Sequence, residues 1–238
     1  MHTLPAAPTR RQEFLCGCRD EFPILLGVAP FGMIYGLFAL RAGLTAFTAQ
    51  AMSAVVFAGS AQLIATQLIR DSAPAAVVVL TIFVVNLRHA FYSASVAPYL
   101  RPLGRRWKWI LAYLLTDEAY AVAASRYLRD GSRPDVSPFR HWYFLGAGLT
   151  LWTSWQLSTA AGIFLGARAP ESWSLDFTLA LTFIALVFPV LRDRASAVAS
   201  LAAGVVAVAA CGMPYKLGLV LAAAAGIVSG VVTEEVRA

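Results

Sequence analysis

Long apolar runs without a charged residue recur along the whole chain. Five of them are between 17 and 28 residues long, and they cover residues 22–40, 42–69, 141–167, 195–215 and 217–233. The hydrocarbon core of a bilayer is about 30 Å thick and is spanned by about 20 residues of α-helix. Several of the runs reach or approach that length, so the pattern predicts an all-α, polytopic membrane protein.

Short polar segments separate the runs and set the boundaries of the expected helices. The expected spans are 22–40, 44–69, 72–100, 108–126, 141–167, 175–191, 195–213 and 215–233. We therefore expect about seven or eight transmembrane helices. The first run is longer than the apolar core of a signal peptide, which has about 7–15 residues, so we expect it to stay in the mature protein.

The longest polar connector predicts how the spans are grouped. Residues 127–140 separate two candidate halves, 22–126 and 141–233, of a single transmembrane transporter domain over 22–233. This connector is the natural seam of the chain, because it is the longest polar stretch between apolar runs.

The two ends of the chain and a weak internal similarity complete the expected organisation. Residues 1–21 carry two prolines and six charged side chains and are expected to be a mobile N-terminal arm ending in a short interfacial helix, whereas 234–238 form a tail. Residues 44–59 align weakly with 175–190. A duplicated unit with an odd number of crossings would give an inverted repeat, an arrangement common in transporters.

Two of the spans are not expected to be plain helices. The span 72–100 has 29 residues, too many for a straight crossing, and its midpoint holds Asn86, Arg88 and His89. The span 44–69 contains the sequence Gly-Ser-Ala-Gln at 59–62. Small and polar residues in mid-span are either notches for helix packing or helix breaks that line a site. At least one interrupted helix is therefore predicted, and both interpretations stay open for 59–62.

Composition and motifs exclude several classes of protein. Hydrophobic residues make up 59% of the chain and charged residues 13%, whereas soluble domains average roughly 25% charged residues. The net charge of +6 comes mostly from basic residues between the runs, where they orient helices, so we expect no nucleic-acid binding. Neither a phosphate-binding loop nor a hydrolase motif is present. The spacing of Cys16 and Cys18 is poor for a metal. No enzyme activity, metal or cofactor is predicted.

Charged residues in mid-membrane carry the strongest functional signal. Arg88 and His89 lie near the centre of 72–100, and Asp117 and Glu118 lie at the centre of 108–126. Each charge at a helix centre costs about 2.5–3.5 kcal/mol on insertion scales. Either an Arg–Asp pair locks two helices together, or these groups line a polar cavity for a charged substrate or a proton. Histidine titrates near neutral pH, so His89 is a candidate proton carrier, with the two carboxyl groups as alternatives.

Three short motifs, in order, resemble the AzlC/BrnF family of branched-chain amino acid permeases. They are Phe-Ala-Gly-Ser-Ala-Gln at 57–62, Val-Asn-Leu-Arg-His at 85–89 followed by Tyr92-Ser93, and Leu-Thr-Asp-Glu at 115–118. The similarity covers residues 22–126. It implies a bacterial inner-membrane exporter of leucine, isoleucine and valine, with methionine as a further candidate. The resemblance also implies the proton motive force as the energy source and a small AzlD/BrnE-like membrane subunit as the partner.

A zwitterionic substrate needs a partner for each charge and an apolar pocket for its side chain. We expect the carboxylate to meet backbone amides around 59–62, and we expect Asp117 to meet the ammonium group or the coupled proton. The predicted substrate-binding residues are Phe57, Gly59, Ser60, Gln62, Asn86, Arg88 and Tyr92, with Phe91 as a further wall. The predicted proton-coupling residues are His89, Asp117 and Glu118. The alternative is a structural membrane subunit that supports another chain, in which the mid-span charges pair statically.

Overall fold

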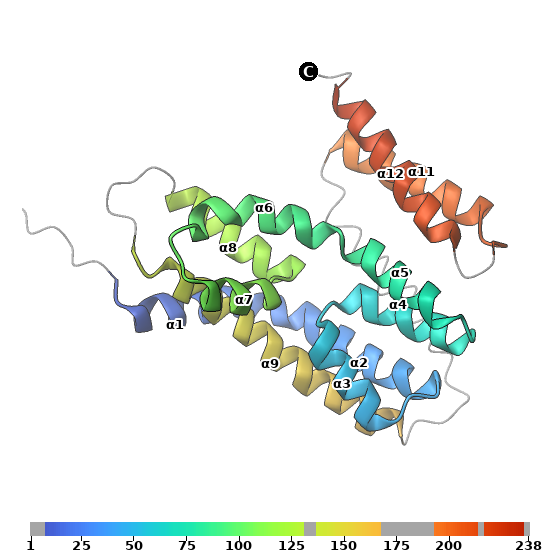
Figure 1. The fold of residues 1–238 in the computed structure, drawn as a ribbon, viewed down its shortest axis with the longest axis horizontal. Coiled ribbons are helices and arrows are strands. Elements are labelled where there is room, and N and C mark those ends of the chain that lie inside the picture. The colour runs from blue at the N-terminus through green and yellow to red at the C-terminus, as the bar shows by residue number, and fades with distance from the viewer. Residues whose placement is uncertain (1–7, 131–136, 168–192, 214–216, 236–238) are drawn as a thin grey trace, which may run out of the picture. The chain divides into compact units, whose positions relative to one another are not determined.

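The protein is described by a computed structural model over residues 8–130, 137–167, 193–213 and 217–235, which are helical apart from short turns (Figure 1). The N-terminal elements are α1 (Arg10–Glu21), η1 (Phe22–Ile24), α2 (Leu25–Arg41), α3 (Ala46–Val56), α4 (Gly59–Arg70), α5 (Ala75–Asn86) and α6 (Arg88–Leu100). They are followed by α7 (Arg105–Tyr113), α8 (Asp117–Asp130), α9 (Arg140–Gly166), α11 (Arg194–Ala209) and α12 (Leu217–Glu235). These ranges contain no β-strand, which confirms the all-α class.

Three stretches of the described chain are long and apolar enough to cross a membrane by themselves. They are Arg10–Arg41, Ala75–Leu100 and Leu217–Glu235. Helices α3 and α11 are apolar but shorter. The total of seven or eight crossings stays a prediction, because the expected span 175–191 lies outside the described residues. The second copy of the suggested repeat, 175–190, lies outside them as well.

The N-terminal segment is helical from Arg10 onward, in the region where the sequence predicted an arm that ends in a short interfacial helix. Thr9 and Gln12 form a reciprocal capping box at the start of α1. The helix then packs along α9 so closely that a Cβ atom on Gly17 would lie 2.0 Å from the carbonyl oxygen of Tyr143. The charged side chains of α1 are typical of a solvated segment, but Glu13 and Glu21 are buried in this helix.

Contacts divide the chain into two units, one with residues 1–64 and 85–168 and another with 65–84 and 169–238. In the first unit, α2 lies beside α9 (Figure 1). Glycine makes this approach close: a Cβ atom on Gly162 would lie 2.0 Å from the carbonyl oxygen of Met33. In the second unit, α11 packs on α12. Helix α9, which follows the connector 127–140, packs on α1 and α2, and the division into halves at this connector stays a prediction.

Three helices of the sequence prediction are broken in the structure. The span 44–69 breaks at residues 57–58, where Phe57 adopts a left-handed backbone conformation with φ 41°. The span 72–100 breaks at Leu87, beside the polar cluster. Both breaks agree with the interruption expected near those residues. The third break, at 114–116, was not foreseen, since 108–126 was expected to be one continuous helix.

Candidate functional site

An ion pair joins the two charged motifs that the sequence singled out. The Arg88 Nη1 atom lies 2.6 Å from Asp117 Oδ2, and Arg88 Nη2 donates a hydrogen bond of 2.7 Å to the Ser60 hydroxyl. The side chains of Arg88 and Asp117 are 33% and 38% exposed. The structure therefore forms the Arg–Asp pair that was one explanation of the mid-span charges, and it leaves both members accessible.

Each member of this network stands at the start of a helix that follows a break. Ser60 lies in the first turn of α4, Arg88 is the first residue of α6, and Asp117 is the first residue of α8. The first N–H groups of a helix have no partner within it and carry partial positive charge. Asp117 is stabilised by its position at such an N-terminus, whereas Arg88 is not. The breaks thus bring together one charged pair and backbone N–H groups that can donate hydrogen bonds to an anion.

Several buried polar atoms around the network have no hydrogen-bond partner of normal geometry among the described residues. They are Arg88 Nε, Asp117 Oδ1, Asn86 Oδ1, both side-chain amide atoms of Gln62, and Trp155 Nε1. Trp155 lies against the start of α4, since a Cβ atom on Gly59 would be 2.8 Å from its ring. Buried polar groups in proteins are normally paired. A cluster of unpaired ones is therefore typical of a site that receives a polar ligand.

His89 and Tyr92 lie beside the network in α6. His89 Nδ1 is 3.1 Å from the carbonyl oxygen of Asn86. A carbonyl can only accept, so Nδ1 carries the hydrogen and Nε2 is the nitrogen that can take up a proton. The His89 ring meets the edge of Tyr92 at 5.9 Å between centroids, and Tyr92 stacks on Tyr120 at 4.4 Å.

The aromatic residues that were expected to form the walls of the substrate site differ in their burial. Phe57 is buried and packs against Tyr113, with ring centroids 5.8 Å apart. Phe91 is 73% exposed on α6 and lines no described cavity.

Glu118, in the first turn of α8, is half-buried. Sequence reasoning missed Glu21, whose carboxyl group is completely buried at the end of α1.

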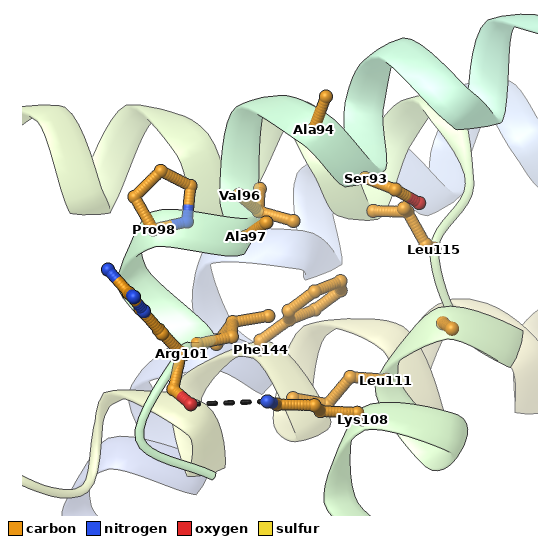
Figure 2. Close-up of a pocket in the computed structure, with 12 residues that line it drawn as sticks. Ser93, Ala94, Val96, Ala97, Pro98, Arg101, Lys108, Leu111, Leu115 and Phe144 are labelled. Atoms are coloured by element: carbon orange, nitrogen blue, oxygen red, sulfur yellow. Dashed lines mark hydrogen bonds between the residues drawn. The ribbon is translucent and has the colours of Figure 1, made fainter. Parts of the chain in front are cut away.

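A cavity of about 550 Å³ lies between α6, α7 and Phe144 of α9 (Figure 2). Its walls include Val96, Leu111 and Leu115 and are largely apolar. Ser93 and Leu115 lie at one end and Arg101 and Lys108 at the other, where Lys108 Nζ donates to the Arg101 carbonyl oxygen at 3.1 Å (Figure 2). Ligand pockets typically measure about 300–1,000 Å³ and are mostly apolar, so this cavity has the size and lining of a ligand pocket.

Comparisons with known proteins agree on one family. The sequence model of the family described as "AzlC protein" matches residues 23–168. The "Inner membrane protein YgaZ" of Escherichia coli (strain K12) is 25% identical over 233 residues, which are 94% of this chain and 91% of that protein. The chain and this relative are therefore similar over nearly their whole lengths.

Two further relatives are membrane or transport proteins by name. The "Branched-chain amino acid transport protein AzlC" of Bacillus subtilis (strain 168) is 24% identical over 74% of this chain and 69% of its own length. An "Uncharacterized membrane protein" of Helicobacter pylori (strain ATCC 700392 / 26695) is 28% identical over 73% of this chain and 75% of its own length. No solved structure matches the chain.

Proposed function

This chain belongs to the AzlC family of membrane proteins, and on that premise we propose that it is a secondary transporter that exports branched-chain amino acids. Leucine, isoleucine and valine are the proposed substrates, with methionine as a further candidate. The proposed energy source is the proton motive force, and the proposed location is the inner membrane of a bacterium. The name of the Bacillus subtilis relative supports the substrate class.

The spare atoms of the Arg88–Asp117 pair carry this proposal. One donor of Arg88, Nε, and one acceptor of Asp117, Oδ1, are buried and have no hydrogen-bond partner of normal geometry among the described residues, while Arg88 Nη1 and Asp117 Oδ2 bond to each other. An amino acid has one carboxylate and one ammonium group. Arg88 Nε and the amides at the start of α4 match the carboxylate, and Asp117 Oδ1 matches the ammonium group.

The apolar cavity between α6 and α7 supports an aliphatic substrate. Two of its lining residues are close in sequence to the pair: Ser93 follows Arg88 by five residues, and Leu115 precedes Asp117 by two. We assign the branched side chain to this cavity, because burial of apolar surface stabilises it by about 25 cal/mol per Å². This placement takes over the role that the sequence gave to Phe91.

A proton and a partner complete the proposed cycle. One charge that crosses a potential of 100 mV gains about 2.3 kcal/mol, which is enough to concentrate a substrate severalfold across the membrane. His89, Asp117 and Glu118 are the proposed proton-coupling residues. A small AzlD/BrnE-like membrane subunit is the proposed partner.

Replacing Asp117 tests the transport role. We expect Asp117→Asn to abolish proton-driven leucine efflux from vesicles, because the amide has no charge to hold the ammonium group, while the protein still elutes as a folded species. Asp130→Asn is the matched control. Like Asp117, Asp130 lies in α8 and pairs with an arginine; its partner is Arg126, at 3.0 Å. Normal efflux by the Asp117 variant would contradict the assigned role.

A double variant separates the transporter from a structural subunit with a static ion pair. In a static lock, removal of one partner leaves an uncompensated charge, whereas removal of both relieves it. Arg88→Gln/Asp117→Asn should therefore restore activity if the pair is only structural. We expect the double variant to stay inactive, because both substrate charges lose their partners.

A further inference from the structure

Glu21 is a carboxyl group in the interior of the first unit that has no counter-ion among the described residues. It is the last residue of α1, its exposed fraction is 0%, and neither carboxyl oxygen has a hydrogen-bond partner among the described residues. An isolated ionised carboxylate is very costly to bury. A group in this position is expected to hold a proton or to exchange one.

The other acidic groups of α1 differ from Glu21 in having a partner. Glu13 is nearly as buried, at 2% exposure, and its Oε1 atom likewise has no hydrogen bond among the described residues, but this atom lies 3.8 Å from the Arg126 guanidinium of α8, within ion-pair distance. Asp20 accepts a hydrogen bond of 2.7 Å from the Tyr143 hydroxyl of α9. Two carboxyl groups of the same helix therefore have partners from α8 and α9, and Glu21 has none within the described part of the chain.

A second carboxyl group acts on Glu21 from α8. Helix α1 contacts α8, and the charge of Glu118 acts electrostatically on Glu21. Glu118 itself is influenced by its neighbour Asp117, by the Thr116 hydroxyl and, less strongly, by Arg88. Two carboxyl groups that interact in a poorly solvated place cannot both ionise at low cost, so a proton on one of them lowers the cost of ionising the other.

The basic and titratable groups of the surrounding helices are engaged elsewhere. Arg126 of α8 pairs with Asp130 and Glu13. The Tyr143 hydroxyl of α9 donates its hydrogen bond to Asp20, and the Arg140 guanidinium lies over the rings of Tyr99 and Tyr127. None of these groups neutralises Glu21.

We propose that Glu21 and Glu118 form a proton-binding carboxyl pair, which lies beside the Arg88–Asp117 pair because Glu118 directly follows Asp117 in α8. A proton bound to the pair sits next to the group that we assign to the substrate ammonium. A positive ammonium at Asp117 stabilises negative charge on Glu118 and so favours release of the proton. Substrate and proton then compete, as proton-driven export requires, and by linkage each weakens the binding of the other equally.

Proton binding by the pair is independent of the transport proposal, whereas its coupling to substrate rests on that proposal. The first experiment therefore measures the proton directly. Infrared spectra of the purified protein in lipid, recorded over a pH series without substrate, report the C=O stretch of protonated carboxyl groups. We expect the wild type to keep such a band at neutral pH, Glu21→Gln to lose it, and Glu13→Gln to retain it.

Glu118→Gln is the second variant, and it keeps the test decisive if Glu21→Gln does not fold. It should move the pH at which the Glu21 band disappears, because the neighbouring negative charge is gone. A neutral-pH band that Glu21→Gln leaves unchanged would overturn the assignment to Glu21. An unmoved titration in Glu118→Gln would overturn the pairing.

Transport then tests the coupling. Leucine efflux by Glu21→Gln should lose its acceleration by an imposed pH gradient, and Glu13→Gln should keep it. A retained response in Glu21→Gln would overturn the coupling role. If the wild type carries no leucine but shows the Glu21 band, the proposed function fails while the proton site stands. If the wild type carries leucine without that band, the proton site alone fails.

Discussion

At the scale of single residues, Arg88 is the group on which the candidate site depends. Its planar guanidinium donates through Nη1 to Asp117 and through Nη2 to Ser60, and its Nε atom is left over. Lysine carries the same charge on a single nitrogen and cannot reproduce this fork. The two residues are therefore not equivalent here.

We expect Arg88→Lys to lower leucine efflux at least about tenfold, which corresponds to roughly 1.4 kcal/mol and to the loss of one charge-assisted hydrogen bond. Efflux of labelled leucine from vesicles with equal amounts of protein measures the change. Arg129→Lys is the control, because the Arg129 Nε atom donates only to the Ser125 carbonyl of its own helix. Unchanged efflux in the Arg88 variant would mean that only the charge matters.

The sequence predicted the residues of the network and an Arg–Asp pair as one alternative, but not the hydrogen bond between Arg88 and Ser60. Ser60, Arg88 and Asp117 stood out because polar groups in apolar runs are costly, and the structure brings all three together. Glu21 did not stand out, because it lies in a segment with five other charged residues. Its burial follows from the contact of α1 with α8 and α9, which no local pattern indicates.

At the scale of elements, the breaks decide where the functional groups lie. At least one break was predicted from small and polar residues inside apolar runs, and for residues 59–62 a helix break was one of two interpretations left open. The break before Asp117 contains neither glycine nor proline. Its signal is a helix start: Thr116 accepts a hydrogen bond from the Ala119 amide at 3.4 Å, and two acidic residues occupy the first turn. That signal was present in the sequence and was overlooked.

Helices α2 and α9 pack closely, and glycine makes this approach possible. We expect Gly162→Ala to destabilise the protein by about 1–3 kcal/mol, because its Cβ atom would meet the backbone of Met33 and the helices would have to shift. Thermal unfolding in detergent should show a melting temperature roughly 3–10 °C lower.

Gly27→Ala provides the matched control for this substitution. Gly27 lies in α2 with no atom within 4 Å of the position that its Cβ would take. We expect no loss of stability there, since alanine is the better helix former. Equal melting temperatures for the Gly162 variant and the wild type would contradict the tight helix contact.

At the scale of the whole molecule, exposed apolar surface indicates a lipid and protein environment. Large hydrophobic side chains such as Phe83 and Leu201 are more than half exposed on the helices of the second unit. In a membrane protein such surfaces face lipid tails or another subunit. This agrees with membership of a family of membrane proteins.

The transport proposal predicts a substrate profile and a dependence on a partner. Vesicles that contain the chain together with a small AzlD/BrnE-like subunit should release labelled leucine and valine faster than vesicles with either protein alone. Methionine should also be released, because its unbranched side chain fits an apolar cavity of about 550 Å³. Efflux that is the same with and without the partner would remove the partner from the proposal.

By itself the sequence determined the membrane environment, the all-α class, the family and the identity of most candidate site residues. These follow from apolar run length, from the cost of charge in hydrocarbon and from short motifs, all of which are local properties of the chain. Only the tertiary structure decided that α1 packs on α9, that three helix starts meet around Arg88, and that Glu21 is buried where α1 contacts α8 and α9. Those features depend on contacts between residues far apart in the sequence, and no local pattern specifies them.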